Sequence, residues 1–345
     1  MTMAYSGVLD DVRTCIHLGR PARVPVFALG EMFNARVAGI TWAEYTNDLG
    51  KLVACEIAAV QQFDYDWVYL NPDDNVEFEP LGVKTRGSDF VPLAAYEFLP
   101  ASWEALGKLR LPAFQRTGRM PAFLAAISQI KRRLRDTICL TSRVAAPFSS
   151  VALLYGTQVA MMMLVEQPEL FRSTAAFFVD MMSAWGRAQI RAGADAIWVG
   201  DCVASSHFIS PAHYADYAAH AAMALNSALR NDGAIVFYHA GESALPHLEL
   251  MADTGPDALS IGGGIDIKHA KETVGKRICL LGNIRGMETL QSGSPAHVAQ
   301  ETRRIMEAGK QHGGFIFNSE EGIPYQTPEE NIRVMMATAK QHARY

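Results

Sequence analysis

Eight short apolar runs, each followed by polar residues and then by a helical pattern, constrain the fold of this chain more than any other feature. Short runs rich in Val, Ile and other apolar residues are typical of buried strands. Strands that alternate with helices indicate a parallel sheet, and eight of them with crossover helices most simply close into a (β/α)8 TIM barrel, an α/β fold. The runs are Val24–Leu29, Trp67–Leu70, Cys139–Val144, Ala196–Gly200, Ala234–Tyr238, Ala258–Ile261, Ile278–Gly282 and Phe315–Asn318.

Clear end signals mark the helices between these runs. Segments 42–63, 168–193, 210–233 and 294–314 have helical patterns. Gly233 is a typical C-terminal stop, and Ser294 followed by Pro295 is a typical N-terminal start. A doubly wound sheet is the competing fold, but no G-x-G-x-x-G motif follows the first run.

Two segments fall outside the regular alternation. We expect the first 20 or so residues to form an extra N-terminal helix. The long stretch from Asn71 to Leu140 is an insertion after the second strand, and we expect a hairpin over 76–86 plus helices there. Because no Gly-, Ser- or Pro-rich linker interrupts the chain, residues 1–345 are predicted to form a single domain.

Composition excludes several classes of partner. The net charge of −5 provides no general field for nucleic acid or an anionic membrane. The five cysteines are scattered and form no CxxC pair, which argues against a disulfide framework and a thiolate zinc knuckle. No apolar run is long enough to span a membrane and no signal peptide is recognisable, so we expect a cytoplasmic protein.

Polar residues follow every predicted strand. In a barrel of this kind the carboxyl ends of the strands meet at one mouth, where reacting groups lie. Buried acids gathered there must be paired, metal-bound or shifted in pKa, so we expect a functional site. The residues are Glu31, Asp73, Asp74, Arg143, Asp201, Cys202, His239, Glu242, Asp266, Asn283, Arg285, Glu320 and Glu321.

With these motifs in place, the chain resembles the uroporphyrinogen decarboxylase superfamily over nearly its whole length. The matching stretches include "FDYDWVYLNPDDNVEFEPLG", "GDCVASSHFISPAHYADY" and "GGFIFNSEEGIPYQTPEENI". The most specific pieces are "GNI" after the seventh run and "TPEEN", Thr327 to Asn331. The resemblance is nearer to the corrinoid-dependent methyltransferase branch than to the decarboxylase, and it implies a (β/α)8 barrel.

The resemblance also implies a zinc site with one histidine and two cysteines. His239 matches the histidine, but Gly241 and Glu321 stand where the family has cysteines. An alignment shifted by one residue would put Tyr238 in place of His239. The ligands that remain available are His239, Glu242 and Glu321, which suit Zn²⁺ or a harder divalent ion.

The decarboxylase itself is the second interpretation. Asp73 matches its catalytic aspartate, but the loop after the first strand, "LGEMFNARVAG", offers Glu31 and only a distant Arg36. An acid that faces a polycarboxylate tetrapyrrole is electrostatically unfavourable.

The favoured interpretation is methyl transfer between a small methylated, methoxy-type substrate and the cobalt of a separate corrinoid protein, in either direction. The partner must carry the corrinoid because the chain lacks a D-x-H-x-x-G signature. His239, Glu242 and Glu321 are the expected catalytic groups, as acids or metal ligands. The expected substrate-binding residues are Glu31, Asp73, Arg143, Asp201, Tyr238 and Asn283. A non-catalytic ligand- or partner-binding barrel remains the alternative to an enzyme, and the sequence leaves a homodimer open.

Overall fold

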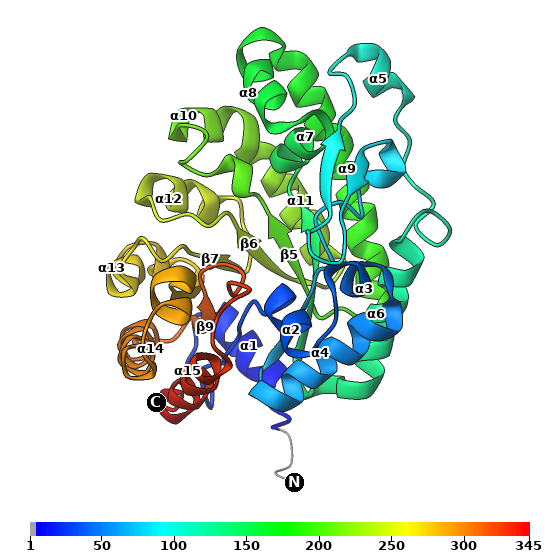
Figure 1. Cartoon of the computed structure of the whole chain (residues 1–345). Helices are drawn as coiled ribbons and strands as arrows, with labels where there is room; N and C mark the ends of the chain where they lie inside the picture. The colour runs from blue at the N-terminus through cyan, green and yellow to red at the C-terminus, as the bar shows by residue number, and fades with distance from the viewer. Residues whose placement is uncertain (1–4) are drawn as a thin grey trace.

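Seven parallel strands lie side by side at the centre of the molecule and helices surround them (Figure 1). The structure, a computed structural model, describes residues 5–345. The sheet curls in the order β1-β4-β5-β6-β7-β8-β9, the arrangement expected of a TIM-barrel-like fold. Its strands are β1 (Trp67–Leu70), β4 (Cys139–Ala145), β5 (Ala196–Gly200), β6 (Ile235–His239), β7 (Ala258–Ser260), β8 (Cys279–Ile284) and β9 (Phe315–Ser319).

The first predicted strand, Val24–Leu29, is wrong as a strand. It forms one isolated parallel bridge, between Val26 and Phe317. The amide of Phe27 donates to the carbonyl of Phe317 at 2.8 Å, and the amide of Asp66 donates to the carbonyl of Val26 at 3.1 Å. The segment therefore joins β9 to the chain entering β1, where the eighth strand of a barrel would lie. Pro25 has no N–H to donate, which prevents a regular ladder.

Side chains complete this join. The amide of Val26 donates to Asp66 Oδ2 at 2.8 Å, and the amide of Leu29 donates to Ser319 Oγ at 3.1 Å. Arg23 binds the Asp66 carboxylate through both terminal nitrogens, at 2.6 and 2.7 Å. We call residues 24–29 the closing segment. It leads directly into Gly30 and Glu31 at the mouth of the barrel.

The helices follow the sequence signals closely. Ser294 accepts a hydrogen bond from the amide of His297 and caps α14, as predicted. The predicted helix over 42–63 is two helices, because the Asp48 side chain caps a new start by accepting from the amide of Lys51. The extra N-terminal helix is α1, and residues 1–4 lie outside the described part of the chain.

The α-helices of residues 5–345 are α1 (Val8–Ile16), α2 (Glu31–Val37), α3 (Trp42–Asn47), α4 (Leu49–Phe63), α5 (Trp103–Lys108), α6 (Met120–Leu134), α7 (Pro147–Tyr155), α8 (Thr157–Glu166), α9 (Pro168–Ala192), α10 (Pro211–His213), α11 (His220–Asn231), α12 (Leu245–Asp253), α13 (Ile267–Glu272), α14 (Pro295–Gly309) and α15 (Glu329–His342). Helix α9 ends at Gly193, whose φ of +115° suits glycine.

The insertion between β1 and β4 contains a hairpin, but not over 76–86 as predicted. The hairpin pairs β2 (Lys84–Arg86) with β3 (Ala94–Glu97) in antiparallel register. Residues Glu79–Leu81 form a 3-10 turn instead, since Pro80 cannot donate to a ladder. Figure 1 shows the hairpin and α5 beside α7, and the amide of Leu99 donates to the carbonyl of Leu154. The insertion thus extends the wall of the barrel mouth.

Aromatic rings fill the barrel interior below the mouth. Phe27 stacks on Trp67 with ring centroids 4.3 Å apart, Trp67 lies edge-on to Trp198, and Trp198 lies 4.8 Å from the ring of His239. These side chains share the inner face because strand residues alternate between faces and parallel partners lie level with each other. The aromatic core therefore supports His239 from below.

The sequence predicted no disulfide framework and no membrane-spanning segment. All five cysteines are free, and Cys202 alone is exposed. Within residues 5–345, no single helix is long and apolar enough to cross a membrane. Helices α7 and α8 together would be long and apolar enough, but they are bent by 112°.

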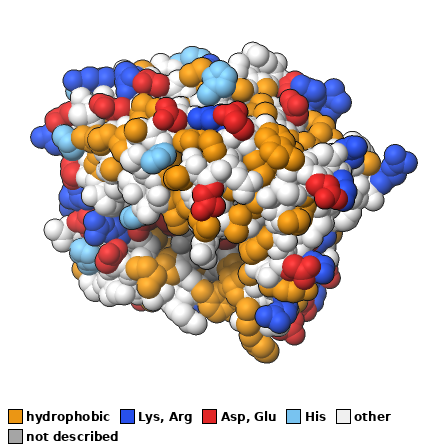
Figure 2. Space-filling view, turned by 90° about the horizontal axis from the view of Figure 1, so that it is seen from above, with side chains coloured by type: hydrophobic (Ala, Val, Ile, Leu, Met, Phe, Trp, Pro, Cys, Tyr) orange, Lys and Arg blue, Asp and Glu red, His pale blue; other side chains and the backbone are white. Residues whose placement is uncertain are grey.

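Figure 2 shows a face of the molecule on which hydrophobic side chains border a hollow.

Candidate active site

A cavity of about 230 Å³ lies at the carboxyl ends of the strands. Its lining combines charged and apolar residues. The charged residues are Glu31, Asp74, Arg143, His239 and Glu321, and the larger apolar ones are Leu29, Tyr69, Leu153, Trp198 and Val203. Four of the residues predicted to catalyse or to bind substrate, Glu31, Arg143, His239 and Glu321, therefore meet in one cavity.

His239 is the last residue of β6, and it lines this cavity. Its Nε2 lies 3.1 Å from Oε2 of Glu321, and its Nδ1 lies 3.0 Å from the hydroxyl oxygen of Ser260. Burial opposes a charged imidazole, but the Glu321 carboxylate and the Cys202 side chain outweigh it and raise the pKa of His239 to about 10. Burial likewise opposes charge on Glu321, yet His239 holds the pKa of that carboxyl below its usual value. At neutral pH the two form an imidazolium–carboxylate pair.

Cys202 lies beside this pair in the same cavity. It begins the short helical turn that follows β5. Its position directly after the strand was visible in the sequence, but nothing there distinguished it from the other four cysteines. Exposure is the distinguishing property, and only the fold reveals it.

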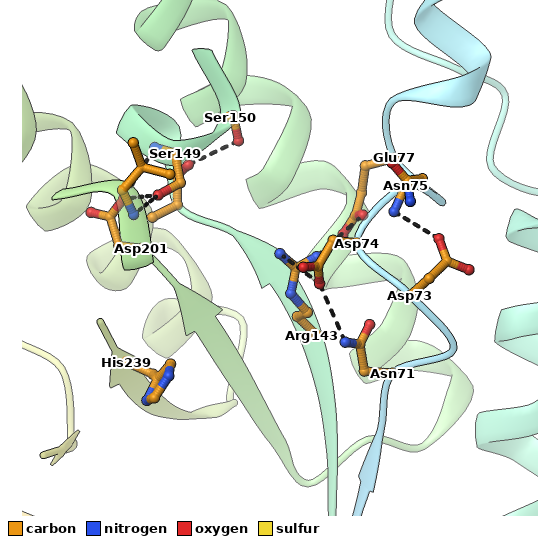
Figure 3. Close-up of polar contacts among 12 residues, drawn as sticks. Asn71, Asp73, Asp74, Asn75, Glu77, Arg143, Ser149, Ser150, Asp201 and His239 are labelled. Carbon is orange, nitrogen blue, oxygen red and sulfur yellow. Dashed lines mark hydrogen bonds and ion pairs between the residues drawn. The ribbon is translucent and has the colours of Figure 1, made fainter. Parts of the chain in front are cut away.

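Arg143, from β4, is the only arginine in the lining and is already engaged (Figure 3). Its Nη2 lies 3.2 Å from Asp74 and its Nη1 lies 3.6 Å from Glu77. Burial raises the pKa of Glu77 to about 7, although Arg143 works against the rise. Asn71 completes the group, with its amide nitrogen 3.4 Å from an Asp74 oxygen. This side of the cavity is therefore close to neutral rather than strongly basic.

Glu31 faces the same space from the start of α2. Its backbone has a φ of +39°, which is uncommon for a residue with a side chain. Burial and the neighbouring Asp74 raise the pKa of Glu31 to about 7. Its one side-chain hydrogen bond in the described structure comes from Asn71 Nδ2, at 3.4 Å.

Two predicted substrate-binding residues, Asp201 and Tyr238, belong to a buried network outside the cavity lining. The Asp201 carboxylate accepts from the amide and hydroxyl of Ser149, at 3.1 and 2.7 Å, and from the Tyr238 hydroxyl. Tyr238 also lies 3.0 Å from Tyr214, oxygen to oxygen. Burial raises the pKa of Asp201 to about 6. Because Tyr238 precedes His239 on one strand, its side chain points to the opposite face.

Asp73 and Asn283 also hold structure rather than line this cavity. Arg119 binds both oxygens of Asp73. The amide of Asn75 donates to the same carboxylate at 2.8 Å (Figure 3). Asn283 donates to the carbonyls of Gly262 and Ile265, at 2.9 and 2.8 Å, and so fixes the glycine-rich loop after β7. The adjacent Asp74, rather than Asp73, reaches the cavity.

The predicted metal ligands do not converge. His239 and Glu321 lie together, but Glu242 is absent from the cavity lining. It accepts four hydrogen bonds, from the amides of Ser206, Ser243 and Ala244 and from the Ser206 hydroxyl. These bonds hold the pKa of Glu242 low, although burial opposes this. Among residues 5–345 no group of three or more His, Cys, Asp or Glu side chains is arranged to hold a metal ion. The residues present therefore do not fit the three-ligand zinc site that the resemblance implied.

A curled parallel sheet with a half-polar cavity at the carboxyl ends of its strands defines a TIM-barrel-like protein of the kind that includes many enzymes. The chain belongs to the uroporphyrinogen decarboxylase (URO-D) family, whose family model matches residues 13–342. The predicted resemblance is thereby confirmed.

Individual relatives include both activities. The uroporphyrinogen decarboxylase of Pelobacter propionicus is 25% identical over 287 residues, 81% of each chain. The methylated-thiol–coenzyme M methyltransferase of Methanosarcina mazei is 24% identical over 231 residues, 66% of this chain and 60% of that one. The solved structure of a methyltransferase from Methanosarcina mazei has a TM-score of 0.87 at 22% identity, covering 97% of this chain and 98% of that one. A B12-independent methionine synthase from Shewanella shares the fold, with a TM-score of 0.60 at 10% identity over 93% and 97%.

Proposed function

We propose that this protein is a methyltransferase that moves a methyl group between a small methylated, methoxy-type substrate and a corrinoid carried by a separate protein. The observation that carries the proposal is the cavity itself, which is small, half apolar, and richer in acids than in arginine. The methyltransferase relative supports the same reading.

The size and charge of the cavity favour a small, uncharged substrate. Pockets for drug-sized ligands have volumes of roughly 300–1,000 Å³, and this cavity has about 230 Å³. Its only arginine already contacts Asp74 and Glu77. A polycarboxylate would meet the carboxylates of Asp74 and Glu321 and would have to share Arg143 with Asp74 and Glu77, whereas Tyr69 and Trp198 offer apolar contact to a methylated group.

The residues of the chain have defined tasks in this proposal. The corrinoid, bound to its own protein, would act as the methyl acceptor or donor, and a hollow bordered by hydrophobic side chains is compatible with docking of such a partner (Figure 2). His239 and Glu321 would orient the substrate heteroatom through their fixed charge pair. No step is assigned to zinc, because Glu242 is committed to the loop around Ser206.

Decarboxylation is the second candidate, and the Pelobacter propionicus relative favours it. The residue matched to the catalytic aspartate of that enzyme, Asp73, is bound by Arg119. It would have to exchange this partner for the substrate. Decarboxylation is therefore a weaker hypothesis for the function of this protein than methyl transfer.

A direct assay separates the two. The purified protein is incubated with chemically reduced cob(I)alamin and a panel of methoxyarenes, methyl thioethers and methylamines, and methylcobalamin is followed by absorbance. Uroporphyrinogen III is assayed in parallel for loss of CO2. Formation of methylcobalamin that H239A and E321Q each reduce supports the proposal. Decarboxylation without methyl transfer, or methyl transfer that neither variant changes, contradicts it.

A further inference from the structure

We propose that Glu31 is the proton donor to the heteroatom that leaves when the methyl group is removed. This inference rests on the proposed methyl transfer and names a catalytic group for it. It assigns to Glu31 the task that the sequence suggested for Glu321 or Glu242.

The backbone conformation of Glu31 and the space left by two nearby glycines fix the position of its carboxyl group. Glu31 follows the closing segment, and its φ of +39° turns the chain into α2 at the cavity wall. Strained backbone of this kind persists where the surrounding structure enforces it. On the opposite side, a Cβ at Gly322 would lie 2.5 Å from Oε2 of Glu31, and a Cβ at Gly30 would lie 2.3 Å from the Asn34 amide. Both glycines leave room that the carboxyl group and its helix use.

Glu31 is the acid in the cavity without a cationic partner. Among the described residues, Asp74 pairs with Arg143, and Glu321 pairs with His239. Glu31 receives only the long 3.4 Å hydrogen bond from Asn71, a neutral amide. A carboxyl group that is removed from water and has no cation beside it favours its neutral, proton-bearing form.

The charged neighbours of Glu31 act in opposite directions on its pKa. Asp74 and Glu321 disfavour the ionised form of Glu31, and Arg143 only partly offsets them. Glu56, Tyr45 and Tyr69 face Glu31 from α4, α3 and β1. With burial as the largest cause, the pKa of Glu31 rises to about 7, which is where a general acid works best at neutral pH.

The other acids of the cavity are poorer donors. Glu321 has a lowered pKa and is ionised at neutral pH, so it holds no proton to give. His239 carries a proton on each nitrogen, but both protons are directed at Glu321 and Ser260, and its pKa of about 10 makes it a weak acid. Asp74 is held by Arg143. Among the carboxyl groups that line the cavity, Glu31 alone combines the absence of an ion pair with a proton available near pH 7.

The step balances with the corrinoid of the proposed function. The C–O bond of a methyl ether breaks and both of its electrons stay on oxygen, while cob(I)alamin supplies the electron pair of the new Co–C bond and becomes formally Co(III). The oxygen takes the proton of Glu31 and leaves as the alcohol or phenol, and Glu31 remains as the carboxylate. Without that proton an alkoxide or phenoxide would have to leave. In the reverse direction, the Glu31 carboxylate would accept the proton.

The test compares wild type with Glu31→Gln, using anisole and 4-methoxybenzonitrile as methyl donors and cob(I)alamin as acceptor. Loss of a general acid costs about 10²–10⁴-fold in rate. We expect E31Q to lose about 10²-fold or more with anisole and clearly less with 4-methoxybenzonitrile, whose phenoxide leaves more easily. Wild-type kcat/KM should fall as pH rises through about 7, and this fall should be absent in E31Q. Equal losses with both donors, or an unchanged pH profile, would overturn the donor role.

Glu56→Gln is the matched control. The pKa of Glu56 is also raised to about 7, mainly by burial, but its carboxylate accepts from Tyr45 and Asn34 and does not line the cavity. E56Q should keep the fall in kcat/KM above pH 7. If E56Q removes that fall and E31Q does not, Glu56 is responsible and the donor role of Glu31 is wrong.

A second measurement does not depend on turnover. In protein labelled with ¹³C at the glutamate side-chain carboxyl, one resonance that is absent in E31Q should titrate near pH 7 in wild type. A Glu31 resonance that titrates near 4.5 refutes the donor role even if methyl transfer is found. If the Glu31 resonance titrates near 7 but wild type turns over neither ether, the raised pKa of Glu31 is supported and the proposed ether demethylation is overturned.

Discussion

Nε2 of His239 and Oε2 of Glu321 lie 3.1 Å apart, so that the end of β6 and the loop after β9 meet across the mouth of the barrel. Because the pair orients the substrate, we expect H239A and E321Q each to lower kcat/KM for methyl transfer by about 10²-fold. Because the two side chains act as one charge pair, the double variant should lose little more than either single variant. Steady-state kinetics of the four proteins measure this, and independent, additive losses would contradict a shared role.

Stability should decrease from slightly acidic to alkaline pH. Burial raises the pKa values of Glu31, Glu56 and Glu77 to about 7 and that of Asp201 to about 6. The folded state therefore holds more protons than the unfolded state between about pH 4 and 7, and the free energy of unfolding falls as pH rises through this range. The raised pKa of His239 extends the decline above pH 7.

Denaturant unfolding at pH 5.5 and pH 8 tests this expectation. The loss should exceed about 1.4 kcal/mol, the value of one pKa unit. E56Q should show a smaller loss than wild type, because glutamine cannot ionise. Below about pH 4.5 the trend reverses, since Glu321 and Glu242, with lowered pKa values, then lose their favourable charged contacts. Equal stability at pH 5.5 and 8 would show that these acids are not buried as described.

Cys202 should be the first thiol to react with an alkylating reagent. It is exposed in the cavity lining, while Cys15, Cys55, Cys139 and Cys279 are buried. Brief treatment of the folded protein with N-ethylmaleimide should add one group per chain and block methyl transfer by filling the cavity. Intact-mass measurement and peptide mapping locate the group. C202A should resist both labelling and inactivation, and labelling of C202A to the wild-type extent would place the reactive thiol elsewhere.

Zinc should not be retained at one ion per chain. Glu242 would have to give up four hydrogen bonds to join His239 and Glu321, and leaving those amides unpaired is costly. Elemental mass spectrometry before and after dialysis against a chelator measures the metal content. One tightly held zinc per chain in wild type that is lost in H239A would show that the loop around Glu242 rearranges to form a site.

The sequence predicted the parts of the site that depend on strand ends. His239, Arg143 and Glu321 reach one cavity because their strands are parallel and end at one mouth. Prediction from the sequence failed where two adjacent residues could each have reached the cavity. Tyr238 and His239 point to opposite faces of one strand, and Asp74 rather than Asp73 reaches the cavity because Arg119, far along the chain, binds Asp73. Patterns of apolar residues contain no information about such distant polar partners.

The fold shows the same limit. The apolar pattern of Val24–Leu29 resembles that of the true strands, but a ladder needs an N–H at each step, and Pro25 has none. The hairpin over 76–86 failed for a similar reason at Pro80. In both segments the composition is typical of a strand, and a proline removes a backbone donor that a regular ladder would use.

The contacts of the closing segment with β9 and with the chain before β1 affect how the substrate specificity of this fold can change during evolution. Elsewhere the direction in which the chain leaves the sheet is set by main-chain ladders, which a side-chain substitution leaves intact. At this join a few main-chain bonds are supplemented by Arg23, Asp66 and Ser319, through bonds to the closing segment and to one another. We therefore expect a substitution at Asp66 or Ser319 to shift the segment that leads to Glu31 while the ladders between the seven strands stay intact. Selection for a new substrate could thus act on two side chains below the mouth while the barrel itself stays constant.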